Sequence, residues 1–249
     1  MPSSKLGAVP RRSYRSPARE KHARETRERI LAAARTEFLR SGYAATTVRA
    51  VARKAGVSVP TVELVFGTKP ALLRAAISFA IRGDAAPVPM LQRGWAQVAE
   101  ATASASDFLA IVARVLTDSA ERSAGLVVAA FEAARADESM LPLADQLRAQ
   151  RAETASWIVD GVIERARPRP ATDRETAIDT IWILMDPHSF CALTEDRGWT
   201  PEQFEHWFAD SAYRLLLQSA APSRTARQDG GDPARRRSTV TRKRGRPAA

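Results

Sequence analysis

The sequence predicts an all-α protein, in which a small three-helix domain near the N-terminus precedes a larger helical domain. Apolar residues recur at helical spacing over most of the chain. Glycine and proline lie mostly at the junctions between these segments, where they begin or end helices. Valine and aromatic residues do not alternate with polar residues over any long run, as a half-buried strand requires. The 45% hydrophobic content of the 249 residues is ample for a core.

Three features of the sequence bear on the cellular location of the protein. No apolar run reaches the ~18 residues that a transmembrane helix needs, so we expect no membrane partner. The first 29 residues are basic but contain no apolar segment, which argues against a secretory signal. Cys191 is the single cysteine and cannot form an internal disulfide, so the chain fits a cytoplasmic location.

The net charge of +10 is distributed unevenly. Residues 1–29 carry 9 basic and 3 acidic side chains, residues 30–83 carry 8 and 2, and residues 222–249 carry 9 and 2, whereas residues 84–221 carry 12 and 21. We therefore expect a polyanionic partner for the N-terminal domain and both tails, and not for the larger domain. Basic tails can also serve solubility alone.

Composition predicts the domain boundaries. Residues 1–24 are polar, basic and proline-containing, which indicates a disordered arm. The small helical domain covers residues 25–83, and the larger domain covers residues 84–220 after the linker GDAAPVP. Residues 221–249 contain almost no large apolar side chain and should form a disordered basic tail.

Six helices are expected in the larger domain. Asp107 should cap the second, Thr172 the fifth and Thr200 the sixth, the last with Pro201 at its first helical position. The apolar spacing places these helices at about residues 90–104, 107–122, 125–137, 142–166, 173–194 and 201–218.

The stretch TTVRAVARKAGVSVPTVELVFGTK, which begins at Thr46, has the local features of two short helices joined by a tight turn. Thr46 and Thr47 can cap the first helix, and Gly56 can end it in a left-handed conformation. Ser58 can cap the second, with Pro60 in its first turn. This is the helix-turn-helix pattern, in which the second helix enters the DNA major groove. An ordinary helical hairpin has the same spacing.

Residues 26–77 resemble the N-terminal domain of the TetR family of transcriptional regulators. The resemblance rests on the pattern ILAAA, then F..SGY..TTVR.VA..AGVS..TV...F..K..LL, which matches along more than 50 positions. The later segment GWTPEQFEHWFADSAYRLLL is also similar to the C-terminal region of the family.

The resemblance implies an all-helical homodimer. We expect no cofactor. Each subunit would have a helix-turn-helix DNA-binding domain over residues 25–83 and a ligand-binding and dimerisation domain over residues 84–220. A small-molecule effector would change the spacing of the two DNA-binding domains and so release a double-stranded DNA operator, as a repressor does. Such release requires that the ligand bind the wrongly spaced state more tightly.

Several residues at helix starts are expected to contact the DNA backbone. Thr46, Thr47 and Arg49 lie at the start of the first short helix, where a phosphate can sit between exposed amides and hydroxyls. The resemblance implies a further phosphate contact from Lys69.

The first turn of the second short helix is expected to contact bases through Ser58, Val59, Pro60 and Thr61. The two apolar residues can pack on thymine methyl groups, and the threonine can donate to a base or a phosphate. Family members usually have an aromatic residue, typically tyrosine, where this chain has Glu63. Phosphate repels a carboxylate, so Glu63 either accepts from cytosine N4 or faces a neighbouring arginine away from the DNA; we favour the second alternative. The basic arms would then supply more of the affinity.

The basic tail contains the sequence RKRGRPAA, in which Arg244, Gly245, Arg246 and Pro247 resemble an AT-hook core. A glycine between two arginines lets an extended segment lie in a narrow minor groove, whose negative potential favours inserted arginines. Arg244 and Arg246 are therefore candidate DNA contacts. The alternative is generic electrostatic anchoring by the tail.

The larger domain offers candidates for a cavity and for a dimer interface. A cavity with few polar groups suits an apolar or aromatic effector. The candidate ligand contacts are Trp95, Phe108, Phe131, Trp157, Trp182 and Met185. The last two predicted helices should form a four-helix interface with a second subunit, through Phe190, Trp207, Tyr213 and Leu216. Each of these side chains can instead belong to the subunit's own core.

The motifs favour a regulator over an enzyme. The chain has no G-x-S-x-G elbow, P-loop, dinucleotide fingerprint or paired metal-ligand motif. His188 and Cys191 lie three residues apart, but a metal site needs more converging ligands, so we expect none. The alternative function is an architectural protein that coats DNA through its basic tails and does not respond to a ligand.

Overall fold

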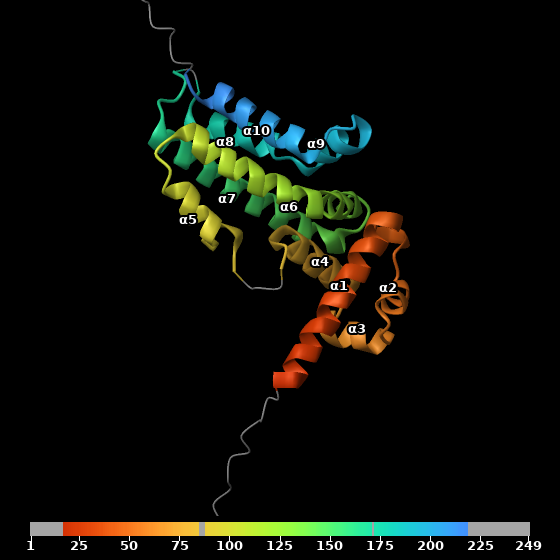
Figure 1. Cartoon of the computed structure of the whole chain (residues 1–249). Helices are drawn as coiled ribbons and strands as arrows, with labels where there is room; N and C mark the ends of the chain where they lie inside the picture. The colour runs from red at the N-terminus through yellow and green to blue at the C-terminus, as the bar shows by residue number, and fades with distance from the viewer. Residues whose placement is uncertain (1–16, 85–87, 171, 219–249) are drawn as a thin grey trace, which may run out of the picture. The chain divides into compact units, whose positions relative to one another are not determined.

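The computed structural model describes residues 17–84, 88–170 and 172–218. Figure 1 shows that this part of the chain is built from helices, and no strand occurs within it. The predicted all-α fold is therefore confirmed for these ranges. The basic tail, with Arg244 and Arg246, lies outside the described residues, as does most of the predicted N-terminal arm.

The N-terminal domain, which we call the head, has four helices: α1 to α3, which correspond to the predicted three-helix unit, and α4, which follows them. Helix α1 includes the last eight residues of the predicted disordered arm, so residues 17–24 are helical. Its regular part ends at Gly42 (φ 69°, ψ 175°). The helices are α1 (Pro17–Ala45), α2 (Val48–Ala55), α3 (Val59–Phe66) and α4 (Lys69–Arg82).

The predicted helix-turn-helix is present between α2 and α3. Thr47 caps α2, since its hydroxyl accepts a hydrogen bond from the N–H of Ala50 at 3.1 Å. Gly56 ends α2 in the left-handed region (φ 66°, ψ 38°), where a side chain would be strained. Ser58 caps α3 by accepting from the N–H of Thr61 at 3.2 Å. Local hydrogen bonds thus define both helix starts.

The head has one apolar core, to which all four helices contribute. Its side chains follow the helical spacing seen in the sequence, which turns one face of each helix inward. The buried residues include Ile30, Ala34 and Phe38 of α1, Val51 and Ala52 of α2, Val62 of α3, and Leu72, Leu73 and Ile77 of α4.

The larger domain, which we call the body, is organised around α6. This helix packs against α1 and α4 of the head and against α5, α7, α9 and α10 of the body. The chain runs from α4 through the 3₁₀ turn η1 to the body helices, whose order can be followed in Figure 1. The elements are η1 (Met90–Gln92), α5 (Gly94–Glu100), α6 (Ala105–Ala134), the 3₁₀ turn η2 (Glu138–Met140), α7 (Leu141–Arg165), α8 (Arg174–Leu184), α9 (Pro187–Cys191), the π-helical segment η3 (Ala192–Asp196) and α10 (Pro201–Leu216).

The helices predicted at 107–122 and 125–137 are in fact the single helix α6. Gly125 lies inside it, where glycine costs about 1 kcal/mol relative to alanine. A Cβ at this position would lie 2.7 Å from Cδ2 of Leu39 in α1. The glycine therefore marks the close approach of α1 and α6, and not a helix end.

The helix predicted at 173–194 is broken between α8 and α9. Pro187 has no N–H and cannot continue α8. Asp186 instead caps α9, accepting from the N–H groups of His188 at 3.1 Å and Ser189 at 3.3 Å. The break was visible in the sequence as Asp-Pro, which favours a turn.

Two of the three predicted caps in the body are wrong by one or a few residues. Ser104, not Asp107, caps α6, and Asp173, not Thr172, caps α8. Thr200 does cap α10, and its hydroxyl and the side chain of the third helical residue form a reciprocal capping box.

Within the described ranges, no single helix is long and apolar enough to cross a membrane. The helices α3 and α4 are long and apolar enough only when taken together, and they are bent by 70° where they meet. The apolar side chains of this pair, such as Val62, Leu72 and Leu73, are buried in the head core.

Gly161→Ala should destabilise the protein by about 1–3 kcal/mol, because a Cβ at Gly161 would lie 2.4 Å from Cζ of the fully buried Phe108. The matched control is Gly125→Ala, which meets only the end of the half-exposed Leu39 and gains helix propensity. Denaturant unfolding of the purified chain measures both. Equal stability of Gly161→Ala and the native chain would contradict this packing.

Candidate nucleic-acid interface and internal cavity

Helix α3 presents a short face that is open to a partner. Of its predicted contacts, Ser58 and Pro60 are exposed, and Val59 and Thr61 are half-buried. Leu64 is 87% exposed and was missed as a contact, although it lies one turn after Pro60 on the same side of the helix. An apolar side chain this exposed on a helix-turn-helix suits contact with thymine methyl groups.

Glu63 also lies on the exposed part of α3. Within the described ranges its carboxylate forms no ion pair, so the favoured expectation of a neighbouring arginine partner is not met there. The carboxylate thus remains available, and acceptance of a hydrogen bond from a base amino group stays a prediction.

The start of α2 is divided between an exposed and a buried threonine. Thr47 and Arg49 are exposed, as a phosphate contact requires. Thr46 is 2% exposed, and its hydroxyl donates to the carbonyl oxygens of Glu37 at 3.0 Å and Gly42 at 2.7 Å. The predicted DNA contact by the Thr46 hydroxyl is therefore wrong, because this hydroxyl closes the end of α1.

Lys69 ties the end of α1 to the start of α4. Its Nζ donates to the carbonyl oxygens of Tyr43 at 2.8 Å and Thr46 at 3.0 Å, and lies 4.1 Å from the centroid of the Tyr43 ring. Burial lowers the pKa of Lys69, which the Asp137 carboxylate opposes. The predicted phosphate contact would be made in exchange for one of these bonds.

An ion-pair cluster joins α1 to α2. The carboxylate of Glu37 accepts from Arg40 at 2.6 Å and lies 3.8 Å from the ammonium of Lys54. The hydrogen bond from Arg40 lowers the pKa of Glu37. Lys54 is thus engaged within the head, while Arg49 remains exposed.

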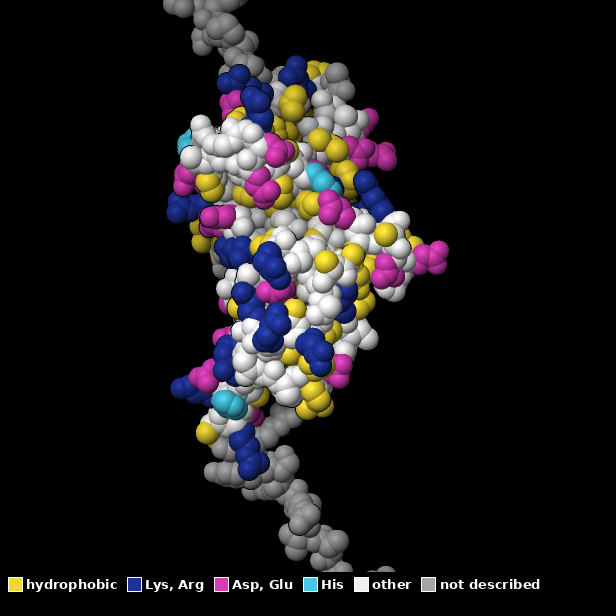
Figure 2. Space-filling model, turned by 90° about the vertical axis from the view of Figure 1, so that its right-hand side faces the viewer, with side chains coloured by type: hydrophobic (Ala, Val, Ile, Leu, Met, Phe, Trp, Pro, Cys, Tyr) yellow, Lys and Arg dark blue, Asp and Glu magenta, His cyan; other side chains and the backbone are white. Residues whose placement is uncertain are grey.

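Basic side chains are concentrated on the head. Figure 2 shows Lys and Arg over the lower part of one face, which the head forms, and more Asp and Glu over the upper part. This agrees with the charge distribution along the sequence. A surface of this kind attracts the DNA backbone.

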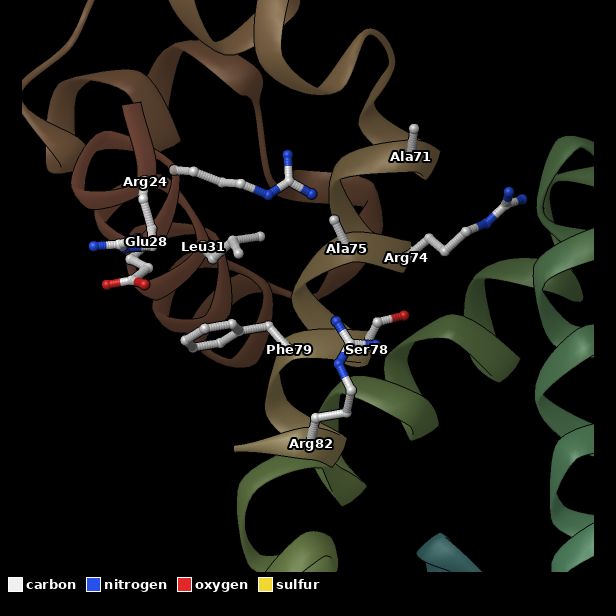
Figure 3. A pocket seen from close by; sticks show the side chains of 10 residues that line it. Arg24, Glu28, Leu31, Ala71, Arg74, Ala75, Ser78, Phe79 and Arg82 are labelled. Carbon is white, nitrogen blue, oxygen red and sulfur yellow. The ribbon is translucent and has the colours of Figure 1, made fainter. Parts of the chain in front are cut away.

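A groove of about 370 Å³ lies between α1 and α4. Figure 3 shows Leu31 of α1 and Phe79 of α4 pointing into the space between the two helices. Its charged lining residues are Arg24, Arg27, Glu28, Arg74 and Arg82. The groove therefore adds to the basic character of the head.

A larger cavity, of about 450 Å³, lies among α4, α6, α7 and α10. Three of the predicted ligand contacts, Trp95, Phe131 and Met185, line it. Phe204 and Phe208 of α10 also line it and were missed, because helical spacing alone does not distinguish a cavity wall from filled core. The volume falls within the ~300–1,000 Å³ typical of ligand pockets.

The other three predicted ligand contacts do not line the cavity. Phe108 is fully buried and packs on the backbone of α7. Trp157 donates through Nε1 to Glu100 at 3.1 Å. Trp182 lies 3.7 Å beneath the guanidinium of Arg151, which does line the cavity. These aromatics pack around the cavity wall and are not part of its lining.

Arg151 is a largely buried charged residue of the cavity wall, with a side chain 9% exposed. Its Nη1 donates to the carboxylate of Asp186 at 2.7 Å. Burial lowers the pKa of Arg151, and Asp186 opposes that shift. The ion pair keeps the guanidinium charged in an apolar wall.

The end of α4 is clamped to α6 beside the cavity. Ser119, which lines the cavity, donates to the carbonyl oxygen of Ile81 at 3.2 Å. Arg122 donates to the carbonyl oxygens of Ala80 at 2.9 Å and Ile81 at 3.3 Å. The last turn of α4 thus belongs to the head and to the cavity wall at once.

The predicted dimer contacts divide into buried and accessible residues. Phe190 and Leu216 are 6% and 3% exposed within one subunit, so their prediction as interface residues is wrong. Phe190 instead lines the cavity and packs edge-on against Phe204, with ring centroids 4.9 Å apart. Trp207 is half-buried and Tyr213 is 38% exposed, so both remain available to a partner.

No group of three or more His, Cys, Asp or Glu side chains suited to a metal ion occurs among the residues that the structure describes. Burial and the nearby Glu195 raise the pKa of Cys191 to about 11.

The head is similar to a known protein family. Residues 30–76 match the family model described as bacterial regulatory proteins, tetR family. Over these residues the head is similar to the N-terminal domain of the TetR family. Its helix-turn-helix is the α2–α3 unit described above. A sequence comparison with curated proteins finds no match.

Solved structures share the TetR-type fold over most of the chain. NalD, the secondary repressor of the MexAB-OprM multidrug efflux pump in Pseudomonas aeruginosa, has 18% identity and a TM-score of 0.56, covering 80% of this chain and 100% of that chain. FadR from Bacillus subtilis in complex with stearoyl-CoA has 16% identity and a TM-score of 0.58, covering 76% and 98%. A protein of Saccharomonospora viridis in complex with choline has 16% identity and a TM-score of 0.58, covering 78% and 99%. The TetR-type head and the shared fold support a role as a DNA-binding transcriptional regulator.

Glu63→Gln should weaken binding to a cytosine-containing preferred site by up to about tenfold, because the amide oxygen still accepts from the base amino group but lacks the charge that makes such a bond about twice as strong. Binding to unrelated DNA should not weaken, since no phosphate contact is lost. The matched control is Arg49→Gln, which should weaken both and reduce the log–log salt slope by about 0.9. Fluorescence anisotropy at several salt concentrations measures these effects. Tighter binding of Glu63→Gln to both DNAs would show that the carboxylate only repels the backbone.

Proposed function

We propose that the chain is a homodimeric transcriptional repressor that leaves its operator when a small, largely apolar ligand enters the body cavity. The observation that carries the proposal is the cavity of about 450 Å³ whose wall includes the last turn of α4, a helix of the DNA-binding head. A ligand in this cavity touches the head directly.

Similar structures support the roles of the two parts. NalD is named as a repressor, and the structures similar to this chain include complexes with stearoyl-CoA and with choline. A fold of this type therefore accommodates small molecules of different chemistry. The cavity of this chain is the candidate place for such a molecule.

The clamp between α4 and α6 is the proposed route of coupling. Ser119 lines the cavity and donates to the carbonyl of Ile81, and Arg122 donates to the same carbonyl. A ligand that displaces Ser119 changes the position of α4 relative to α6. In a dimer, this change alters the distance between the two α3 helices, the recognition helices that enter the major groove. These must lie about 34–36 Å apart on DNA.

Selection of random DNA by the purified chain tests sequence-specific binding. We expect a palindromic site, because two identical heads read two half-sites, and the same site from a variant that lacks residues 222–249. An AT-rich flank seen only with the full chain would support insertion of Arg244 and Arg246 into the minor groove. The absence of an enriched site with either protein would favour the alternative of an architectural DNA-coating protein.

Ile183→Glu should convert the dimer to a monomer, because Ile183 of α8 is 57% exposed and lies on the helix pair proposed as the interface. Placing an unpaired charge in an apolar interface is costly. Ile163→Glu on α7 is the matched control, since Ile163 is 39% exposed but lies outside that pair. Light scattering coupled to gel filtration gives the mass of each variant. Loss of the dimer in both variants, or in neither, would contradict the assignment.

A further inference from the structure

Three residues that line the body cavity carry a buried hydrogen-bond donor without a partner. Among the described residues, four buried side-chain polar atoms have no hydrogen-bond partner: Nε of Arg82, Nε1 of Trp95, Oγ1 of Thr117 and Nε of Arg151. The three nitrogen atoms belong to residues that line the cavity. Each is an N–H donor without an acceptor, and buried donors of this kind are unfavourable unless a ligand or water satisfies them.

The positive charge in the cavity wall is not fully compensated. Arg151 is paired with Asp186, but Arg82 forms no ion pair with any residue in the described ranges. Glu153 is the one acidic residue in the described lining, and it is exposed to solvent. Figure 3, a view of the groove between α1 and α4, shows Arg82 extending back along α4 toward Ser78; both residues line that groove and also the cavity. The wall therefore favours an anion over a cation.

Aromatic side chains alone would suit a different ligand. Trp95, Phe131 and Phe204 could surround a quaternary ammonium group through cation–π contacts. Two guanidinium groups in the same wall oppose this choice, because they repel a cation and have no acceptors of their own to gain from it. A carboxylate, in contrast, supplies two acceptor oxygens in the geometry that a guanidinium matches.

We propose that the effector is an apolar carboxylate, whose anionic group accepts hydrogen bonds from Arg82 while its hydrocarbon part lies against the aromatic and aliphatic wall. This inference rests on the proposed function, because it names the ligand class of the same cavity.

The position of Arg82 gives the carboxylate a direct effect on the head. Arg82 is the last residue of α4 and follows Ile81, whose carbonyl is held by Ser119 and Arg122. A carboxylate that binds Arg82 therefore acts on the turn that joins α4 to α6. A neutral ligand of the same shape fills the cavity without this contact.

Titration calorimetry of the full chain without DNA tests the ligand class with three probes of equal chain length: decanoate, 1-decanol and decyltrimethylammonium. Decanoate should bind about tenfold more tightly than decanol, and the ammonium probe should bind most weakly. Arg82→Gln should remove the preference for decanoate and leave the affinity for decanol unchanged. Arg82→Lys, which keeps the charge, should retain part of the preference.

Arg74→Gln is the matched control on the same helix, because Arg74 is exposed and is not part of the cavity lining. This variant should bind all three probes as the native chain does. Thermal unfolding of each variant verifies that the fold is intact before affinities are compared.

The outcomes separate this inference from the proposed function. Equal affinities for decanoate and decanol, tighter binding of the ammonium probe, or no binding of any probe would overturn the carboxylate inference. Release of the selected DNA is measured separately with the same probes. Decanoate binding without DNA release would refute the proposed release mechanism and leave the ligand class standing. DNA release by the ammonium probe alone would refute the carboxylate inference and leave the release mechanism standing.

Discussion

The structure depends on how α4 is held at its two ends. At its start, the ammonium of Lys69 bonds to carbonyl oxygens at the end of α1 and so positions the helix within the head. At its end, Ser119 and Arg122 of α6 bond to the carbonyl of Ile81. Gly83 then ends the helix with a positive φ of 77°, and a side chain there would lie 3.3 Å from the Arg122 guanidinium. One helix is thereby shared by the DNA-binding core and the cavity wall.

The recognition helix α3 exposes more apolar than basic side chains. Its exposed face offers Pro60 and Leu64 to a partner, with the carboxylate of Glu63 between them and the hydroxyl of Ser58 at the start. Such a face is better suited to methyl groups and base edges than to phosphate oxygens. Electrostatic affinity must then come from basic residues elsewhere on the head, where Figure 2 shows them gathered.

The cavity combines an apolar wall with buried polar groups that serve different purposes. Asp186 caps α9 and also pairs with Arg151, so one carboxylate fixes both a helix start and a guanidinium from another helix. Trp182 packs on the other side of that guanidinium. Arg151 is thus held rigidly by its surroundings, whereas Arg82 at the end of α4 is not paired in the described part of the chain. The two arginines differ in the freedom they have to respond to a ligand.

Most of the head could be predicted from the sequence, because its helix limits rest on short-range chemistry. Thr47, Gly56 and Ser58 act on amides or carbonyls within about one turn, and apolar spacing decides which face is buried. The body could be predicted only as a set of helices. Which of two adjacent threonines is buried, why Gly125 lies mid-helix, and which aromatics line a cavity all depend on helices that meet from distant parts of the chain. Periodicity shows that a residue faces inward, but packing alone decides whether it meets another side chain or an open cavity.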